Sequence, residues 1–121
     1  MLSKELAADT EKAILRREEL GSTGIGKGVA VPHAKVTGIT GTVGALGRSR
    51  DGVSFNSLDG QPVQLIFLLI SSPEEVEMHL RVLRKVTALI KDDDFCNFLK
   101  RAGDRDELAD LLREAEDRVA V

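Results

Sequence analysis

The residues best suited to chemistry lie between Gly21 and Ala34, in the run GSTGIGKGVAVPHA. A glycine-rich segment leads into the aliphatic stretch Val29-Ala30-Val31, and Pro32 then fixes the backbone directly before His33. Neutral imidazole is a nucleophile near pH 7, and glycines leave room for a partner or a phosphate to approach. The pattern indicates phosphoryl chemistry carried on His33. The alternative is that His33 is an ordinary half-buried polar residue after a strand.

Two nucleotide-binding interpretations of the glycine-rich segment are weaker. The run from Gly21 to Gly28 is one residue away from a P-loop, because Gly28 stands where Ser or Thr would hold magnesium. A P-loop also follows a strand and opens a helix, whereas here we expect a helix before the segment and a strand after it. Gly24, Gly26 and Gly28 are spaced too evenly for the dinucleotide pattern, which needs two residues before its third glycine.

Neither a metal centre nor another cofactor is expected. His33 and His79 are the only histidines, and Cys96 is the only cysteine. The run Asp92-Asp93-Asp94 lacks the alternating oxygen spacing of a calcium loop, so we interpret it as a solvated helix start. A single cysteine cannot form an internal disulfide, which fits a reducing cytoplasm.

Length and composition predict one soluble, cytoplasmic domain over residues 1–121. The net charge is −3 with acids and bases interleaved, so no basic face for nucleic acid is expected. Four Phe with no Trp or Tyr argue against base-stacking platforms. The N-terminus lacks the apolar core of a secretory signal, and the longest apolar run, Leu65 to Ile70, is too short to span a bilayer. No direct membrane insertion is therefore expected.

The segments around His33 are predicted from apolar spacing and turn residues. A helix is expected from about Ser3 to Leu20, with Gly21 as its C-cap and with Asp9 or Thr10 as an alternative start. Four glycines in eight residues predict a loop or turn from Gly21 to Gly28. Short strands are expected at Val29–Val31 and Gly41–Leu46. Arg48 to Gly60 is expected to be turn-rich, with Asp51-Gly52 and Asp59-Gly60 as turn signals.

The second half of the chain predicts one buried strand followed by three helices. The β-prone run Val63 to Ile70 is typical of a central strand buried on both faces. Ser72 as cap and Pro73 at the first helical position predict a helix that continues to Ile90. Further helices are expected after Asp92–Asp94, ending at Gly103, and from Asp104 onward. The irregular alternation favours an α+β class, a three-layer α/β/α sandwich in which a mixed β-sheet is flanked by helices on both faces.

These residues resemble a known family. One stretch of the chain has the pattern Arg17-Glu18-x3-Ser22-Thr23-Gly24-x-Gly26-x-Gly28-Val29-Ala30-Val31-Pro32-His33-Ala34. This pattern is similar to the signature of type-2 IIA (EIIA) domains of the bacterial phosphoenolpyruvate-dependent phosphotransferase system (PTS). The resemblance is to the fructose/mannitol type and its nitrogen-regulatory relatives. It extends through Phe55-x4-Gly60-Gln61-Pro62-Val63-x-Leu65-Ile66-Phe67, through His79-Leu80-x2-Leu83 and into the Glu107-Leu108 helix. Family domains normally carry roughly another helix and strand before this point, so the domain is expected to be short at its N-terminus.

The resemblance implies a phosphotransferase function for named residues. His33 would accept a phosphoryl group on Nε2 from the carrier HPr or its nitrogen-branch paralogue. His79 would donate a hydrogen bond to the phosphoryl oxygens, and Arg17 would be a nearby cation. Ser22, Thr23 and Gly24 would form the phosphoryl-binding loop, in which backbone amides from Ser22 to Gly28 can act as donors.

The same residues also have structural interpretations. His79 can be a surface residue of an amphipathic helix, and Arg17 a cation that interacts with the carbonyls at a helix end. Ser22 and Thr23 can be ordinary turn residues.

Three roles remain open for such a domain. The GSTGIGKGVAVPH and GQPV segments favour the nitrogen-regulatory group, in which phosphorylation changes the binding of a regulatory target. The alternative is sugar uptake, in which the phosphoryl group passes to a IIB domain. A third possibility is an inactive interaction module, against which the presence of both His33 and His79 argues.

Overall fold

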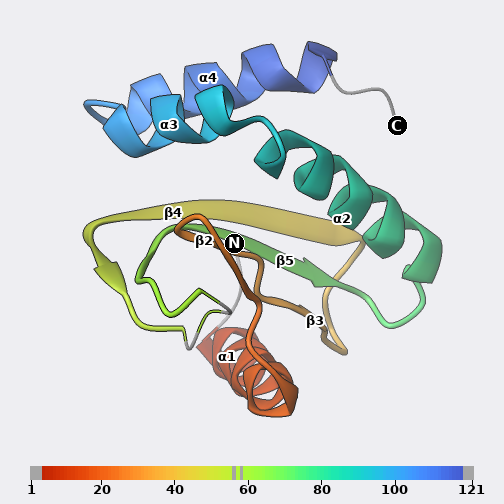
Figure 1. Cartoon of the computed structure of the whole chain (residues 1–121). Helices are drawn as coiled ribbons and strands as arrows, with labels where there is room; N and C mark the ends of the chain where they lie inside the picture. The colour runs from red at the N-terminus through yellow and green to blue at the C-terminus, as the bar shows by residue number, and fades with distance from the viewer. Residues whose placement is uncertain (1–3, 56, 58, 119–121) are drawn as a thin grey trace. The chain divides into compact units, whose positions relative to one another are not determined.

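The computed structural model describes residues 4–55, 57 and 59–118. The chain divides into two compact units, Met1–His79 and Leu80–Val121. Figure 1 labels most of the elements of each unit. The described residues form four helices and a five-stranded mixed sheet, which confirms the predicted α+β class.

The sheet of the first unit is built around strand β5 (Val63–Ser71). β5 pairs in parallel with β2 (Val29–Ala30) and then with β3 (His33–Lys35), and antiparallel with β4 (Thr42–Val53). A short strand, β1 (Gly24–Gly26), adds antiparallel to β2. The side chains of β5 are buried at every second position and throughout its last three residues, so the predicted central strand is confirmed.

Helix α1 (Lys4–Leu20) packs its apolar side chains against the sheet. Leu6 and Ile14 contact a buried cluster of Val36, Ile39 and Ile70. The helix predicted from about Ser3 to Leu20 is confirmed over the described residues, and Ser3 lies outside them. The alternative start at Asp9 or Thr10 is wrong, because the helix extends back to Lys4 and the Thr10 hydroxyl donates to the Leu6 carbonyl (2.7 Å) inside it.

In two places a strand forms where glycines predict a loop or a turn. The segment predicted as a loop from Gly21 to Gly28 contains β1, and the chain reverses into β2 at Lys27 (φ 59°) and Gly28 (φ 76°). Strand β4 runs to Val53, so the predicted turn at Asp51-Gly52 is wrong. Gly52 (φ 87°) instead lies at an irregularity in the pairing of β4 with β5.

The turn expected at Asp59-Gly60 is present, with the Gly60 amide donating to the Ser57 carbonyl (2.9 Å). Strand β3 was not predicted, because three residues beginning with histidine carry little strand signal of their own.

Helix α2 (Val76–Ile90) begins later than predicted and crosses the boundary between the two units. Ser72 is not its cap. The Glu75 amide donates to the Ser72 carbonyl (3.0 Å), which closes a turn before the helix starts. His79 therefore lies in the first turn of α2, and its amide donates to the Glu75 carbonyl (2.9 Å).

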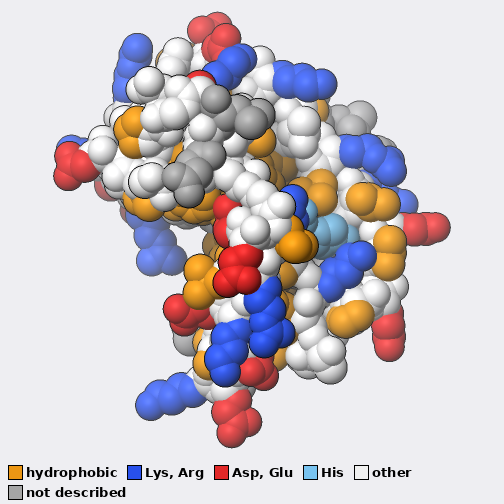
Figure 2. Space-filling model, turned by 60° about the horizontal axis from the view of Figure 1, so that its bottom comes forward, with side chains coloured by type: hydrophobic (Ala, Val, Ile, Leu, Met, Phe, Trp, Pro, Cys, Tyr) orange, Lys and Arg blue, Asp and Glu red, His pale blue; other side chains and the backbone are white. Residues whose placement is uncertain are grey.

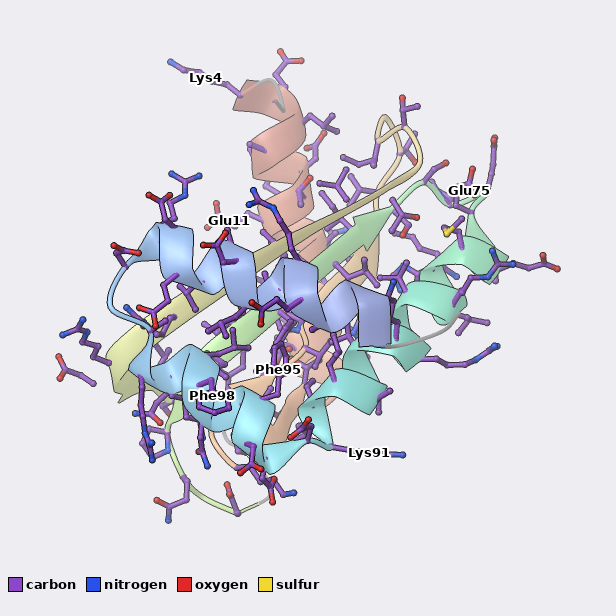
Figure 3. All side chains as sticks on the ribbon, turned by 90° about the horizontal axis from the view of Figure 1, so that it is seen from above. Lys4, Glu11, Glu75, Lys91, Phe95 and Phe98 are labelled. Carbon is purple, nitrogen blue, oxygen red and sulfur yellow. The ribbon has the colours of Figure 1, made fainter. Side chains whose placement is uncertain are left out.

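The second unit continues with α3 (Asp93–Arg101) and α4 (Arg105–Arg118), which contact each other. Asp92 caps α3 by accepting from the Phe95 amide (3.1 Å), as the sequence predicts, and Asp104 accepts from the Glu107 amide (2.9 Å) at the start of α4. Phe95 and Phe98 both lie on α3 (Figure 3), where Phe95 is buried and Phe98 is exposed. Among the helices in the described part of the chain, none has both the length and the apolarity needed to cross a membrane.

Candidate functional site

The main chain of His33 is fixed by the central strand. His33 opens β3, where it is in register with Leu69 of β5. The Leu69 amide donates to the carbonyl of Pro32 (3.0 Å), directly before His33. Because Pro32 has no N–H, the ladder along β5 is interrupted between β2 and β3, and the chain resumes pairing at the histidine.

One hydrogen bond sets the tautomer of the His33 imidazole. Its Nδ1 lies 2.8 Å from the carbonyl oxygen of Val31. A carbonyl can only accept, so Nδ1 carries the proton and donates it. In the neutral ring Nε2 is then the unprotonated nitrogen, with its lone pair available as a nucleophile. The side chain is half-buried, and Figure 2 shows histidine at the molecular surface.

The second histidine lies beside the first. The ring centroids of His33 and His79 are 5.6 Å apart, with the planes inclined at 55°. His79 is buried, and its Nδ1 lies 2.7 Å from the hydroxyl oxygen of Ser71, the last residue of β5. The Ser71 hydroxyl is also 3.2 Å from that of Thr42 on β4. The burial contradicts the interpretation of His79 as a solvent-facing helix residue.

Burial also lowers the pKa of His79 from its ordinary value of 6.5, and the charges of His33 and Lys35 lower that pKa further. A histidine with a lowered pKa is neutral at pH 7. The pair therefore avoids two cationic rings in contact, and each neutral ring has one donor nitrogen and one acceptor nitrogen.

The loop after α1 is held in place by its own side chains. Glu18 accepts from the Thr23 amide (3.1 Å) and from the Thr23 hydroxyl. The Ser22 hydroxyl donates to the Phe55 carbonyl and accepts from the Gly24 amide (2.9 Å). The Thr23 carbonyl accepts from the Val31 amide (3.1 Å), which ties this loop to the segment that leads to His33.

The amides of this loop are less available than expected. Those of Thr23 and Gly24 donate to Glu18 and Ser22, and the Lys27 amide donates to Asp59 (3.1 Å). The prediction of open donors from Ser22 to Gly28 is therefore wrong for these three amides, which stabilise the loop itself.

Glu18 belongs to the signature quoted above, but the sequence predicted no role for it, although it gave a signal. An acidic residue in the last turn of a helix opposes the helix dipole, which suggests that the carboxylate has another partner. In the structure that partner is Thr23. The role of Ser71 had no comparable signal in the sequence.

Arg17 lies at the end of α1, and its Nη1 donates to the Gly21 carbonyl (3.0 Å). This geometry matches the structural interpretation of a helix-end cation. Within the described residues no hydrogen bond or ion pair joins Arg17 to His33.

A mostly apolar pocket of about 410 Å³ lies beside the loop. Its lining includes Ile14 and Leu15 of α1, Ser22 of the loop, and Pro32, which precedes His33. Among the described residues no group of three or more His, Cys, Asp or Glu is placed to hold a metal ion.

Comparison with known proteins identifies the family to which this chain belongs. The sequence model of the family described as "Phosphoenolpyruvate-dependent sugar phosphotransferase system, EIIA 2" matches residues 1–115. The chain belongs to this family of phosphoryl carriers.

Individual relatives lie in both branches of the family. The chain is 38% identical over 104 residues to the "PTS system fructose-specific EIIABC component" of Bacillus subtilis (strain 168), covering 86% of this chain and 16% of that protein. It is 34% identical over 119 residues to a "Nitrogen regulatory protein" of Klebsiella oxytoca, covering 95% and 74%. The solved structure of "Nitrogen Regulatory Protein IIA-Ntr from Neisseria meningitidis" superposes with a TM-score of 0.83 at 35% identity, covering 92% of this chain and 78% of that one.

Proposed function

We propose that this protein is a phosphohistidine carrier of the phosphoenolpyruvate-dependent phosphotransferase system, and that His33 Nε2 is the phosphoryl acceptor. One observation carries the proposal. The Val31 carbonyl holds the proton on Nδ1 of His33, so Nε2 is the nucleophilic nitrogen, and a second buried imidazole lies 5.6 Å away.

The reaction is a displacement at phosphorus between two imidazoles. The His33 Nε2 lone pair forms the new N–P bond as the N–P bond of the donor phosphohistidine breaks, and that bonding pair returns to the donor ring. The two N–P bonds are chemically similar, so the protein has to align the rings and offset charge rather than supply a large driving force. The Nδ1 proton stays on His33, where the Val31 carbonyl stabilises the positive charge that develops on the ring.

Neighbouring residues have defined roles in this proposal. His79 donates a hydrogen bond to the phosphoryl oxygens, and Arg17 adds positive charge at the end of α1. Ser22, Thr23 and Gly24 shape the wall of the site through the hydrogen bonds of their loop. The protein needs no metal ion for this transfer.

We propose a nitrogen-regulatory role, with HPr or its nitrogen-branch paralogue as phosphodonor and a regulatory target as receiver. The Klebsiella oxytoca relative and the Neisseria meningitidis structure both carry the nitrogen-regulatory name. The second candidate is sugar uptake through a IIB domain, which the fructose-specific relative favours. In either case the chain acts as one cytoplasmic EIIA type-2 domain, in line with the single family match over residues 1–115.

Intact mass spectrometry after incubation with phosphoenolpyruvate, enzyme I and HPr tests the proposal. The wild type is expected to gain one acid-labile phosphoryl group, and His33→Ala none. His79→Ala is the matched control, because it removes the other imidazole of the pair and is expected to keep acceptance while slowing it about 10²-fold.

A His33→Ala variant that still gains one phosphoryl group would contradict the assignment of the acceptor. A folded wild type that gains none from either HPr or the nitrogen-branch donor pair would contradict the carrier function.

A further inference from the structure

The two imidazoles are anchored through the same ring atom but by chemically different partners. His33 Nδ1 faces a carbonyl oxygen, whereas His79 Nδ1 faces the Ser71 hydroxyl at 2.7 Å. A carbonyl only accepts, but a hydroxyl can also donate. The two rings can therefore be held as opposite tautomers, although each leaves its Nε2 for chemistry.

We infer that Ser71 is a positioning residue that donates its hydroxyl proton to His79 Nδ1 and thereby holds His79 as the Nε2–H tautomer. The inference rests on the proposed function, in which His79 must donate to the phosphoryl oxygens carried on His33. A neutral His79 protonated on Nδ1 instead would present a lone pair to those oxygens, and two acceptors repel.

The surroundings of Ser71 support this direction of donation. Ser71 has no exposed surface, so bulk water does not compete for its proton. The Ser71 hydroxyl has two acceptors within reach, the Thr42 hydroxyl oxygen at 3.2 Å and His79 Nδ1 at 2.7 Å, and the shorter contact favours donation to His79. The alternative, with Ser71 donating to Thr42, would place the proton on His79 Nδ1.

The backbone fixes Ser71 from both sides. It is in register with Lys35 of β3 and with Thr42 of β4. The position of its hydroxyl is therefore set by the sheet, whereas His79 comes from the first turn of α2. The charges of His33 and Lys35, both on β3, lower the pKa of His79, so both disfavour a cationic His79. The neutral ring is the relevant form, and its tautomer decides what Nε2 can do.

Nitrogen-15 NMR of the imidazoles at pH 7.5 measures the tautomer without any phosphotransfer. In the unphosphorylated wild type we expect His79 to be protonated on Nε2 and His33 on Nδ1. Ser71→Ala removes the donor, so we expect His79 to lose its Nε2–H preference. Thr42→Val is the matched control, since it deletes the neighbouring hydroxyl and leaves Ser71 in place, and it is expected to keep the wild-type tautomer.

A kinetic measurement completes the test. Phosphoryl uptake from HPr is expected to slow about fivefold in Ser71→Ala, the scale of one neutral hydrogen bond, and to stay near the wild-type rate in Thr42→Val. Amide NMR spectra identify any variant that fails to fold. If Ser71→Ala does not fold, the His79 tautomers in the wild type and in Thr42→Val decide the question. If Ser71 donated to Thr42 in the wild type, Thr42→Val would free the Ser71 proton and convert His79 from Nδ1–H to Nε2–H.

The inference is overturned if wild-type His79 is protonated on Nδ1. It is also overturned if a folded Ser71→Ala keeps the wild-type tautomer of His79, whatever its rate of phosphoryl uptake. A wild type that takes up no phosphoryl group contradicts the proposed function instead, and the nitrogen spectra still decide the tautomer.

Discussion

Replacement of Gly24 by alanine is expected to destabilise the loop beside His33 by a predictable amount. A Cβ on Gly24 would overlap the buried Ser57 hydroxyl oxygen and lie 3.1 Å from Ser22 Oγ. Overpacking of this kind costs about 1–3 kcal/mol, and the smaller freedom of alanine in the unfolded chain returns about 0.4–1 kcal/mol. We therefore expect Gly24→Ala to lower the free energy of unfolding by about 1.3 kcal/mol, within a range of about 0–2.6 kcal/mol, measured by urea denaturation with far-UV circular dichroism.

Gly47→Ala on β4 is the matched control. A Cβ at Gly47 meets nothing within 4 Å, so the same chemical change is expected to leave stability unchanged or slightly raised. In a Ser57→Ala background the oxygen that overlaps is gone, and the cost of Gly24→Ala is expected to fall by about 1 kcal/mol. The reasoning is refuted if Gly24→Ala is as stable as Gly47→Ala, or if its cost is the same in the Ser57→Ala background as in the wild type.

Three further variants test individual contacts. Hydrogen bonds from the amides of Gln61 and Lys27 lower the pKa of Asp59 in the folded protein below its ordinary 3.8. The ionised Asp59 therefore stabilises the wild type relative to Asp59→Asn fully above about pH 3.8, and this difference disappears as the pH falls through the pKa of Asp59 in the folded state. Acid unfolding curves of the two proteins measure the difference. For His79, an NMR titration is expected to give a pKa below 6.5 that rises in Lys35→Met, and an unchanged value would exclude Lys35 as a cause. Thr23→Val removes the hydroxyl bond to Glu18 and is expected to lower stability by about 1 kcal/mol, whereas Thr23→Ser retains it; equal denaturation midpoints for the two would contradict a role for that bond.

The sequence predicted the elements whose signals are local. Strand β5 carries a continuous β-prone run, α1 carries apolar spacing, and His33 follows a proline that fixes the backbone before it. Strands β1 and β3 each have three residues and depend on pairing with β2 and β5, so their own sequences contain little evidence for them.

The same reasoning explains the wrong turn prediction within β4 and the contact in the site that the sequence did not predict. Asp51-Gly52 has the composition of a turn, but pairing with β5 carries the strand past it and leaves only a local irregularity at Gly52. The Ser71 hydroxyl reaches His79 because β5 ends where α2 starts its first turn, an arrangement that only the tertiary structure specifies.

The end of β5 has a dynamic consequence for the histidine pair. Leu69 holds the main chain at His33, and Ser71 holds the ring of His79. Because one strand carries both attachments, a displacement of that strand moves the two rings together, and their separation changes less than the position of either one. In the proposed transfer the pair would meet the phosphodonor already assembled, so little reorganisation would be needed. We expect amide hydrogen exchange at Leu69 to require the global opening of the sheet, so the spacing of the two imidazoles should last as long as the folded state.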